Sequence, residues 1–134
     1  MLAYEDGAAA IDWLTRAFAF RERQGSRYVE DGRVTHAELD VGDGSVVYLA
    51  TPTNDYRSPR RHRETCPDAA RWSQVPWVID GVLVHVRDVD EHRRRAAEAG
   101  ALLLSEIEQQ PWGRLYRAED LEGHRWMFLE PRDE

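Results

Sequence analysis

The sequence predicts an α+β fold built from two βαβββ modules. The first observation is an internal repeat: residues 32–38 (GRVTHAE) and 113–119 (GRLYRAE) are identical at four of seven positions. Each copy is followed by a glycine-containing turn and a strand-like run. Each copy is also preceded by a helical pattern that begins after an aspartate. The 134 residues suffice for one domain of this kind.

The first module is expected to begin with a strand ending at Tyr4. Asp6 is suited to cap the following helix, in which Ile11, Leu14 and Phe18 fall on one stripe. In the second module, Asp88 caps the helix and Gly100 ends it. The remaining strands are expected at 21–30, 33–41 and 45–51 in the first module, and at 81–86, 102–108, 114–119 and 124–129 in the second.

A long connection joins the two modules. These boundaries divide the chain into module one (1–51), a connecting segment (52–79) and module two (80–134). Connections of this length are rarely idle in a compact domain. A short helix is expected at 63–72, and Trp72 and Trp77 indicate a flap that packs over a groove.

Composition excludes several classes of function. The net charge of −7 argues against binding of nucleic acid, and no apolar run is long enough to span a membrane. We therefore expect no nucleic acid or membrane partner and, without a secretory signal, a cytoplasmic location. The lone Cys66 is expected to be a reduced thiol. The arginine-rich run 57–63, His62 and His92 are expected to be solvated.

Three segments carry a family resemblance. They are YEDGAAAIDWLTRAF near the start, VLVHVRDVDEHRRRAAEAGA in the middle and EDLEGHRWMFLEP near the end. With the duplicated module, they resemble the vicinal oxygen chelate superfamily of glyoxalase I, extradiol dioxygenases and bleomycin-resistance proteins, and in particular its PhnB-like branch. The resemblance implies that the modules form curved mixed sheets, or half-barrels, with the helices outside. It also implies that the concave face of the sheets binds a small molecule and that a homodimer completes the site.

Metal-dependent members of that superfamily place four ligands on the concave face. Carried over to this chain, three of these positions are Tyr48, Gly81 and Met127, and the fourth falls before Met1. Divalent metals prefer carboxylate or imidazole ligands, so we expect no metal and no cofactor. A relocated metal site at His36, Glu38 and His85 remains an alternative.

Strand alternation predicts which side chains line the concave face. Trp126 and Phe128 point the other way, into the core. His85 has two interpretations: a general base or hydrogen-bond donor to a ligand, or a half-buried histidine bonded to Glu38 or Tyr48. The expected ligand-binding residues are His36, Glu38, Tyr48, His85, Arg117, Arg125 and Met127, together with Trp77 from the flap.

Two classes of function fit these residues. The favoured one is a metal-free module that binds or sequesters a small organic molecule, possible ligands including antibiotics. The alternative is a lyase, isomerase or dioxygenase that uses an unconventional metal, or His85, Glu38 and Tyr48 as acid and base. Arg117 or Arg125 would then stabilise the negative charge of an intermediate.

Overall fold

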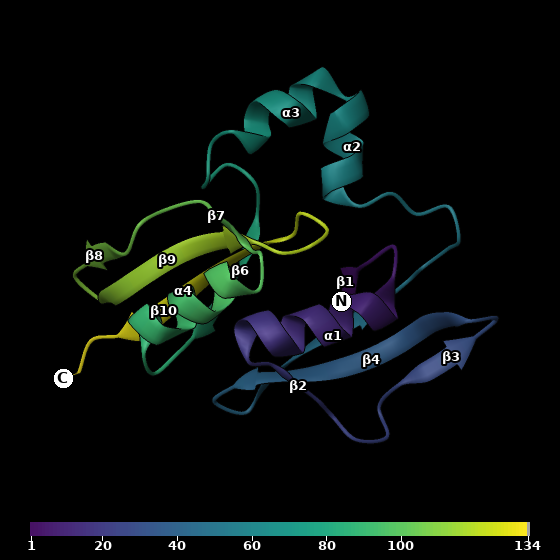
Figure 1. Cartoon of the computed structure of the whole chain (residues 1–134), viewed down its shortest axis with the longest axis horizontal. Helices are drawn as coiled ribbons and strands as arrows, with labels where there is room; N and C mark the ends of the chain where they lie inside the picture. Colours follow the sequence, from purple (N-terminus) through teal and green to yellow (C-terminus); the bar gives the residue numbers. More distant parts are fainter. Residues whose placement is uncertain (134) are drawn as a thin grey trace.

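The computed structural model describes residues 1–133 and arranges them as two five-stranded mixed sheets with four helices (Figure 1). In each sheet the first strand runs parallel to the last strand of its module, and the other pairings are antiparallel. The first module contains β1 (Leu2–Ala3), α1 (Gly7–Phe18), β2 (Arg21–Glu22), β3 (Tyr28–Glu30), β4 (Arg33–Gly42) and β5 (Ser45–Ala50). The second contains β6 (Gly81–His85), α4 (Val89–Glu98), β7 (Leu102–Leu103), β8 (Glu108–Gln110), β9 (Gly113–Glu119) and β10 (Arg125–Pro131). The predicted α+β fold of two βαβββ modules is confirmed.

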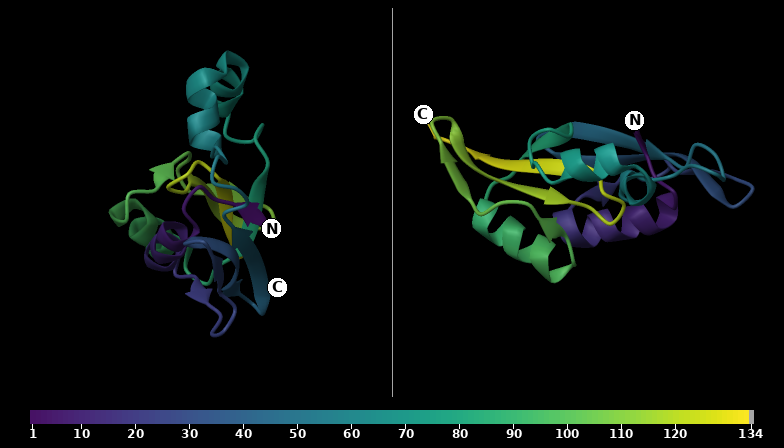
Figure 2. Two further views of the ribbon diagram at one scale, coloured as in Figure 1. Left: turned by 90° about the vertical axis from the view of Figure 1, so that its right-hand side faces the viewer. Right: turned by 90° about the horizontal axis from the view of Figure 1, so that it is seen from above.

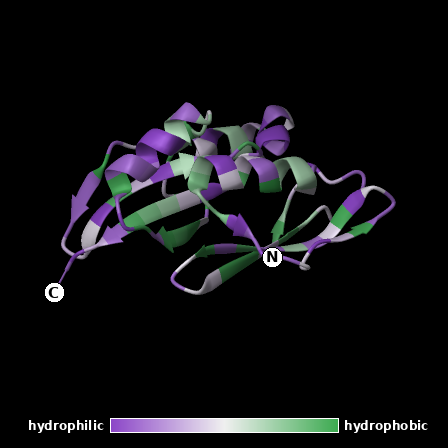
Figure 3. Ribbon diagram, turned by 60° about the horizontal axis from the view of Figure 1, so that its bottom comes forward, coloured by the Kyte–Doolittle hydropathy of each residue, from purple (hydrophilic) through white to green (hydrophobic). Residues whose placement is uncertain are grey.

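Both predicted helix starts are confirmed. The Asp6 side chain accepts a hydrogen bond from the Ala9 backbone N–H, and the Asp88 side chain accepts one from the Glu91 N–H. The two capped helices, α1 and α4, lie side by side on the same side of the sheets (Figure 2). Figure 3 shows both hydrophilic and hydrophobic residues along the strands. No helix within residues 1–133 is long and apolar enough to cross a bilayer.

Each module has one predicted strand that is divided in two. The expected strand 21–30 is split into β2 and β3, and the expected strand 102–108 into β7 and β8. At each break a serine hydroxyl accepts a hydrogen bond from a backbone N–H of the neighbouring strand. Ser26 accepts from Glu38 and Ser105 from Arg117, each with an N···O distance of 3.1 Å. The serine side chain replaces a bond of the backbone ladder, so the strand can leave the sheet locally.

The same serines define the structural repeat. Glu38 lies opposite Tyr48, and Arg117 lies opposite Met127. Glu38 therefore corresponds to Arg117, whereas the repeated sequence aligns Glu38 with Glu119. The aligned sequences are offset by two residues from the equivalent strand positions. Because side chains alternate between the two faces of a strand, a shift of two residues leaves each side chain on the face that was predicted for it.

The two modules share one hydrophobic core, and the partly buried His92 packs against it. This residue was expected to be solvated, but it is on the same α4 stripe as the buried Val89 and Ala96. One His92 ring nitrogen lies 2.6 Å from the Tyr116 hydroxyl and the other 3.0 Å from the Phe18 carbonyl oxygen. Burial lowers the pKa of His92 to about 4.

The connecting segment forms two helices rather than one. They are α2 (Pro59–Thr65) and α3 (Pro67–Ser73). Proline disfavours helical backbone at the preceding residue, and Cys66 is accordingly extended and separates the two helices. Figure 1 shows both helices standing at one end of the second sheet.

Candidate ligand-binding site

The inner face of the second sheet carries an ordered array of side chains. Pairing between β9 and β10 places Arg125 opposite Glu119, Met127 opposite Arg117 and Leu129 opposite Leu115. Trp126 and Phe128, which alternate with these residues, are buried in the core as predicted, with 1% and 0% of their surface exposed.

A buried ion cluster joins this sheet to the connecting segment. Arg63 donates two hydrogen bonds of 2.8 Å to Glu119, and Arg125 donates to the same carboxylate. Arg125 also donates to the carbonyl oxygens of Ser73, the last residue of α3, and of Val75, just beyond it. Burial raises the pKa of Glu119, but the hydrogen bonds from the two arginines outweigh it and hold the pKa below its usual value.

The expectation that the arginine-rich run is solvated is wrong in part. The Arg63 side chain is 22% exposed and belongs to the ion cluster. The Arg60 guanidinium donates to the carbonyl oxygen of Asp120, and the Arg60 backbone N–H donates to the carbonyl oxygen of Glu122. These bonds fix α2 to the turn between β9 and β10.

A cleft of about 170 Å³ lies between residues 76–81 and the inner face of β9 and β10. Four predicted ligand-binding residues line it: Trp77, Arg117, Arg125 and Met127. Arg117 is held by Glu108 at 3.2 Å and lies 2.8 Å from the Met127 sulfur. Trp77 is 72% exposed. The connecting segment therefore forms one wall of a cleft whose floor is a rigid sheet.

His36, Glu38 and Tyr48 form a second group, on the first sheet. His36 Nε2 lies 2.9 Å from a Glu38 carboxylate oxygen, and the His36 and Tyr48 rings meet edge to face at 5.1 Å. Tyr48 lines a separate hollow of about 300 Å³ with Met1, Leu2 and nearby valines. Of these three residues only Tyr48 lines that hollow, so Tyr48 and the cleft residues face separate hollows of the single chain.

His85 belongs to neither group. The expected hydrogen bond to Glu38 or Tyr48 is not made; the His85 ring is half exposed and lies 3.7 Å from the Asp43 carboxylate. The turn between β4 and β5 approaches the end of β6, and a Cβ on Gly42 would lie 3.6 Å from the His85 carbonyl oxygen. That proximity places Asp43, rather than Glu38, beside the ring.

The three residues that the resemblance places at metal-ligand positions supply no carboxylate or imidazole side chain. Gly81 and Met127 line the cleft and offer only a thioether, while Tyr48 lies on the other sheet. Within residues 1–133, no three histidine, cysteine, aspartate or glutamate side chains gather closely enough to hold a metal ion, so His36, Glu38 and His85 are not assembled into the alternative site. Metal-free binding stays a prediction.

That prediction can be checked by thermal denaturation. We expect the melting temperature to be the same in EDTA and in stoichiometric Zn²⁺ or Ni²⁺, because the family positions lack ligands for these ions. His36→Ala/Glu38→Ala is the control for a relocated site. A rise of several degrees in the wild type that this double variant abolishes would contradict the prediction.

Three comparisons place the chain among known proteins. A sequence model of the Glyoxalase/Bleomycin resistance protein/Dioxygenase superfamily matches residues 1–128. An uncharacterized protein of Mycobacterium bovis is 33% identical over 135 residues, which cover 97% of this chain and 80% of that protein. The PhnB-like branch stays a prediction.

Solved structures agree with this assignment. The crystal structure of TioX from Micromonospora sp. ML1 is similar with a TM-score of 0.68 and 36% identity, covering 99% of this chain and 94% of that chain. TnmS3, an antibiotic binding protein from Streptomyces sp. CB03234, matches with a TM-score of 0.63 and 18% identity, covering 98% of this chain and 91% of that chain.

Proposed function

Because this chain belongs to the glyoxalase/bleomycin resistance protein/dioxygenase superfamily, we propose that it binds and sequesters a small organic molecule in the cleft beside Trp77. The exposed Trp77 ring is the observation that carries the proposal. A large aromatic side chain left 72% exposed beside a cleft offers apolar surface that a ligand would bury. The structural likeness to TnmS3 supports the fold's capacity to hold an antibiotic.

The floor of the cleft fits a ligand with both apolar and polar parts. Met127 offers a polarizable surface for an aromatic ring, and Arg117 offers donors to a carbonyl or hydroxyl oxygen. Both side chains project from paired strands, and Arg117 is further held by Glu108. Such a preorganised floor reduces the entropy lost on binding.

Acid–base catalysis is the weaker proposal. It would need His85 to work with Glu38 and Tyr48 on one substrate. Glu38 is hydrogen-bonded to His36, whereas His85 faces Asp43. Groups that do not converge on one hollow have no common reacting atom.

Binding can be tested with a thermal-shift panel of aromatic natural products, followed by calorimetry of any compound that binds. We expect Trp77→Ala to weaken binding about 10-fold, the loss of roughly 1.4 kcal/mol of aromatic contact. Trp72→Ala is the matched control, because Trp72 lies in the same segment, stacks with Arg71 and is outside the cleft. Equal loss in both variants would contradict the proposal.

A homodimer is part of the same proposal. The cleft of about 170 Å³ is smaller than the several hundred Å³ of typical ligand pockets, so a partner wall is needed to enclose a drug-sized molecule. Tyr48 and Leu83 are 44% and 49% exposed on the inner faces of the two sheets and offer apolar surface to a second copy. Light scattering at tens of micromolar should give twice the 15.5 kDa of one chain. A mass of 15.5 kDa would refute the dimer.

A further inference from the structure

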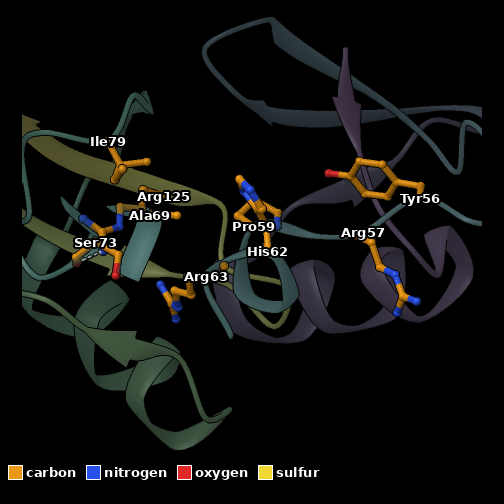
Figure 4. Close-up of a pocket in the computed structure, with 10 residues that line it drawn as sticks. Tyr56, Arg57, Pro59, His62, Arg63, Ala69, Ser73, Ile79 and Arg125 are labelled. Carbon is orange, nitrogen blue, oxygen red and sulfur yellow. Dashed lines mark hydrogen bonds between the residues drawn. The ribbon is translucent and has the colours of Figure 1, made fainter. Parts of the chain in front are cut away.

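A hollow larger than the cleft beside Trp77 lies between the connecting segment and the end of the second sheet. It has a volume of about 480 Å³ and is enclosed by α2, α3 and the turn between β9 and β10 (Figure 4). Only Ile79 and Arg125 also line the cleft beside Trp77. Its volume falls within the range of small-molecule sites, unlike that of the cleft.

The charged lining of this hollow is entirely basic, although the chain carries a net charge of −7. Arg63 and Arg125 lie at one end, and Arg57 and His62 complete the set. Glu119 offsets one of the two charges at the Arg63–Arg125 end, which leaves a net positive charge there.

Donors remain for a ligand at that end. Arg63 donates one N–H from each terminal nitrogen to Glu119, which leaves three of its five N–H groups without a partner in the structure. The Arg57 and His62 side chains make no hydrogen bond or ion pair within the described chain. Ala69, Ile79 and Pro59 supply apolar wall between these groups.

We propose that this hollow is a second small-molecule site, which binds a flat apolar molecule bearing one oxyanion, such as an aromatic carboxylate. The carboxylate lies at the Arg63–Arg125 end, where guanidinium donors match its geometry. The apolar body lies along Ala69 and Ile79. The site is separate from the cleft beside Trp77, although the two share Ile79 and Arg125, and it needs no metal.

Three naphthalene derivatives that differ in charge test the proposal. They are 2-naphthoate, 2-naphthamide and 2-naphthylmethylamine, each titrated into ¹⁵N-labelled full-length protein. Saturable amide shifts are expected at Ala69, Ser73 and Gly123 with the naphthoate. The neutral and cationic compounds are expected to bind at least about 10-fold more weakly, because they lack the charge that the arginines recognise.

A pair of charge reversals localises the site. Arg57→Glu is expected to weaken naphthoate binding several-fold, and Arg71→Glu to leave it unchanged. Both arginines lie in the connecting segment and are exposed, but only Arg57 lines the hollow. The proposal is overturned if the three compounds bind equally, if the shifts centre on Gly81 and Met127, if Arg71→Glu weakens binding as much as Arg57→Glu, or if naphthoate does not bind at millimolar concentration.

Discussion

Replacing Glu119 with alanine is expected to lower the free energy of unfolding by about 3–5 kcal/mol, the usual result of removing one partner of a buried ion pair. The Glu119 carboxylate is fully buried, and Arg125 is only 5% exposed. Without Glu119, the largely buried Arg125 guanidinium is left without its counter-ion. Urea denaturation followed by tryptophan fluorescence measures the loss.

A surface ion pair supplies the control. Glu91 and Arg94 are hydrogen-bonded one helical turn apart on α4, with both side chains more than half exposed. Water solvates these groups when the pair is broken, so Glu91→Ala is expected to change stability little. Comparable losses in the two variants would show that the Glu119 cluster contributes no more than a surface pair.

The Glu119 effect should depend on pH in a defined direction. The folded-state pKa of Glu119 is lowered, so its stabilisation is present above the unfolded-state pKa of about 4.3 and is lost as the pH falls through the folded-state pKa. The curves of wild type and Glu119→Ala are therefore expected to converge only below about pH 4.

Local patterns predicted the fold well. The aspartate caps at Asp6 and Asp88 and the alternation that buries Trp126 and Phe128 depend on residues close together in sequence. The register of the repeat did not follow from local patterns. It depends on which backbone N–H donates a hydrogen bond to the Ser26 and Ser105 hydroxyls. In each case the donor is 12 residues from the serine in the sequence.

The candidate site was harder to predict because its contacts span long stretches of sequence. Arg63 is 56 residues from Glu119, so the run 57–63 viewed alone is typical of a solvated surface. Alternation assigned side chains to the inner faces but carried no information on how the two sheets are placed. The separation of Tyr48 from Met127 into different hollows is set by that placement.

The connecting segment links these features. Arg125 contacts Glu119 on the sheet and the carbonyl oxygens of Ser73 and Val75 at the end of α3, and it lines both the cleft and the larger hollow. One buried guanidinium thus fixes the wall that the two hollows share. Loss of Glu119 is therefore expected to disturb both hollows as well as stability.

Mild acid is expected to destabilise the protein through His92, in a pH range where Glu119 is still ionised. The folded-state pKa of His92 is about 4, below its ordinary value of 6.5. Between these values the unfolded chain binds a proton that the folded chain excludes, so the free energy of unfolding falls as the pH decreases. From pH 7.5 to pH 5 the expected loss is about 2 kcal/mol.

The matched variant is His92→Gln, whose amide can still bond the Tyr116 hydroxyl or the Phe18 carbonyl oxygen but does not titrate. Urea denaturation of both proteins at half-unit pH intervals gives the two stability curves. We expect the variant to be less stable at pH 7.5, because it loses the packing of the His92 ring against Phe128, whose ring centroids are 4.2 Å apart. Between pH 7.5 and 5, its free energy of unfolding should lack the decrease that protonation of His92 causes. Parallel curves for the two proteins would show that His92 takes up its proton in the folded state at an ordinary pH and that the core admits the charged ring.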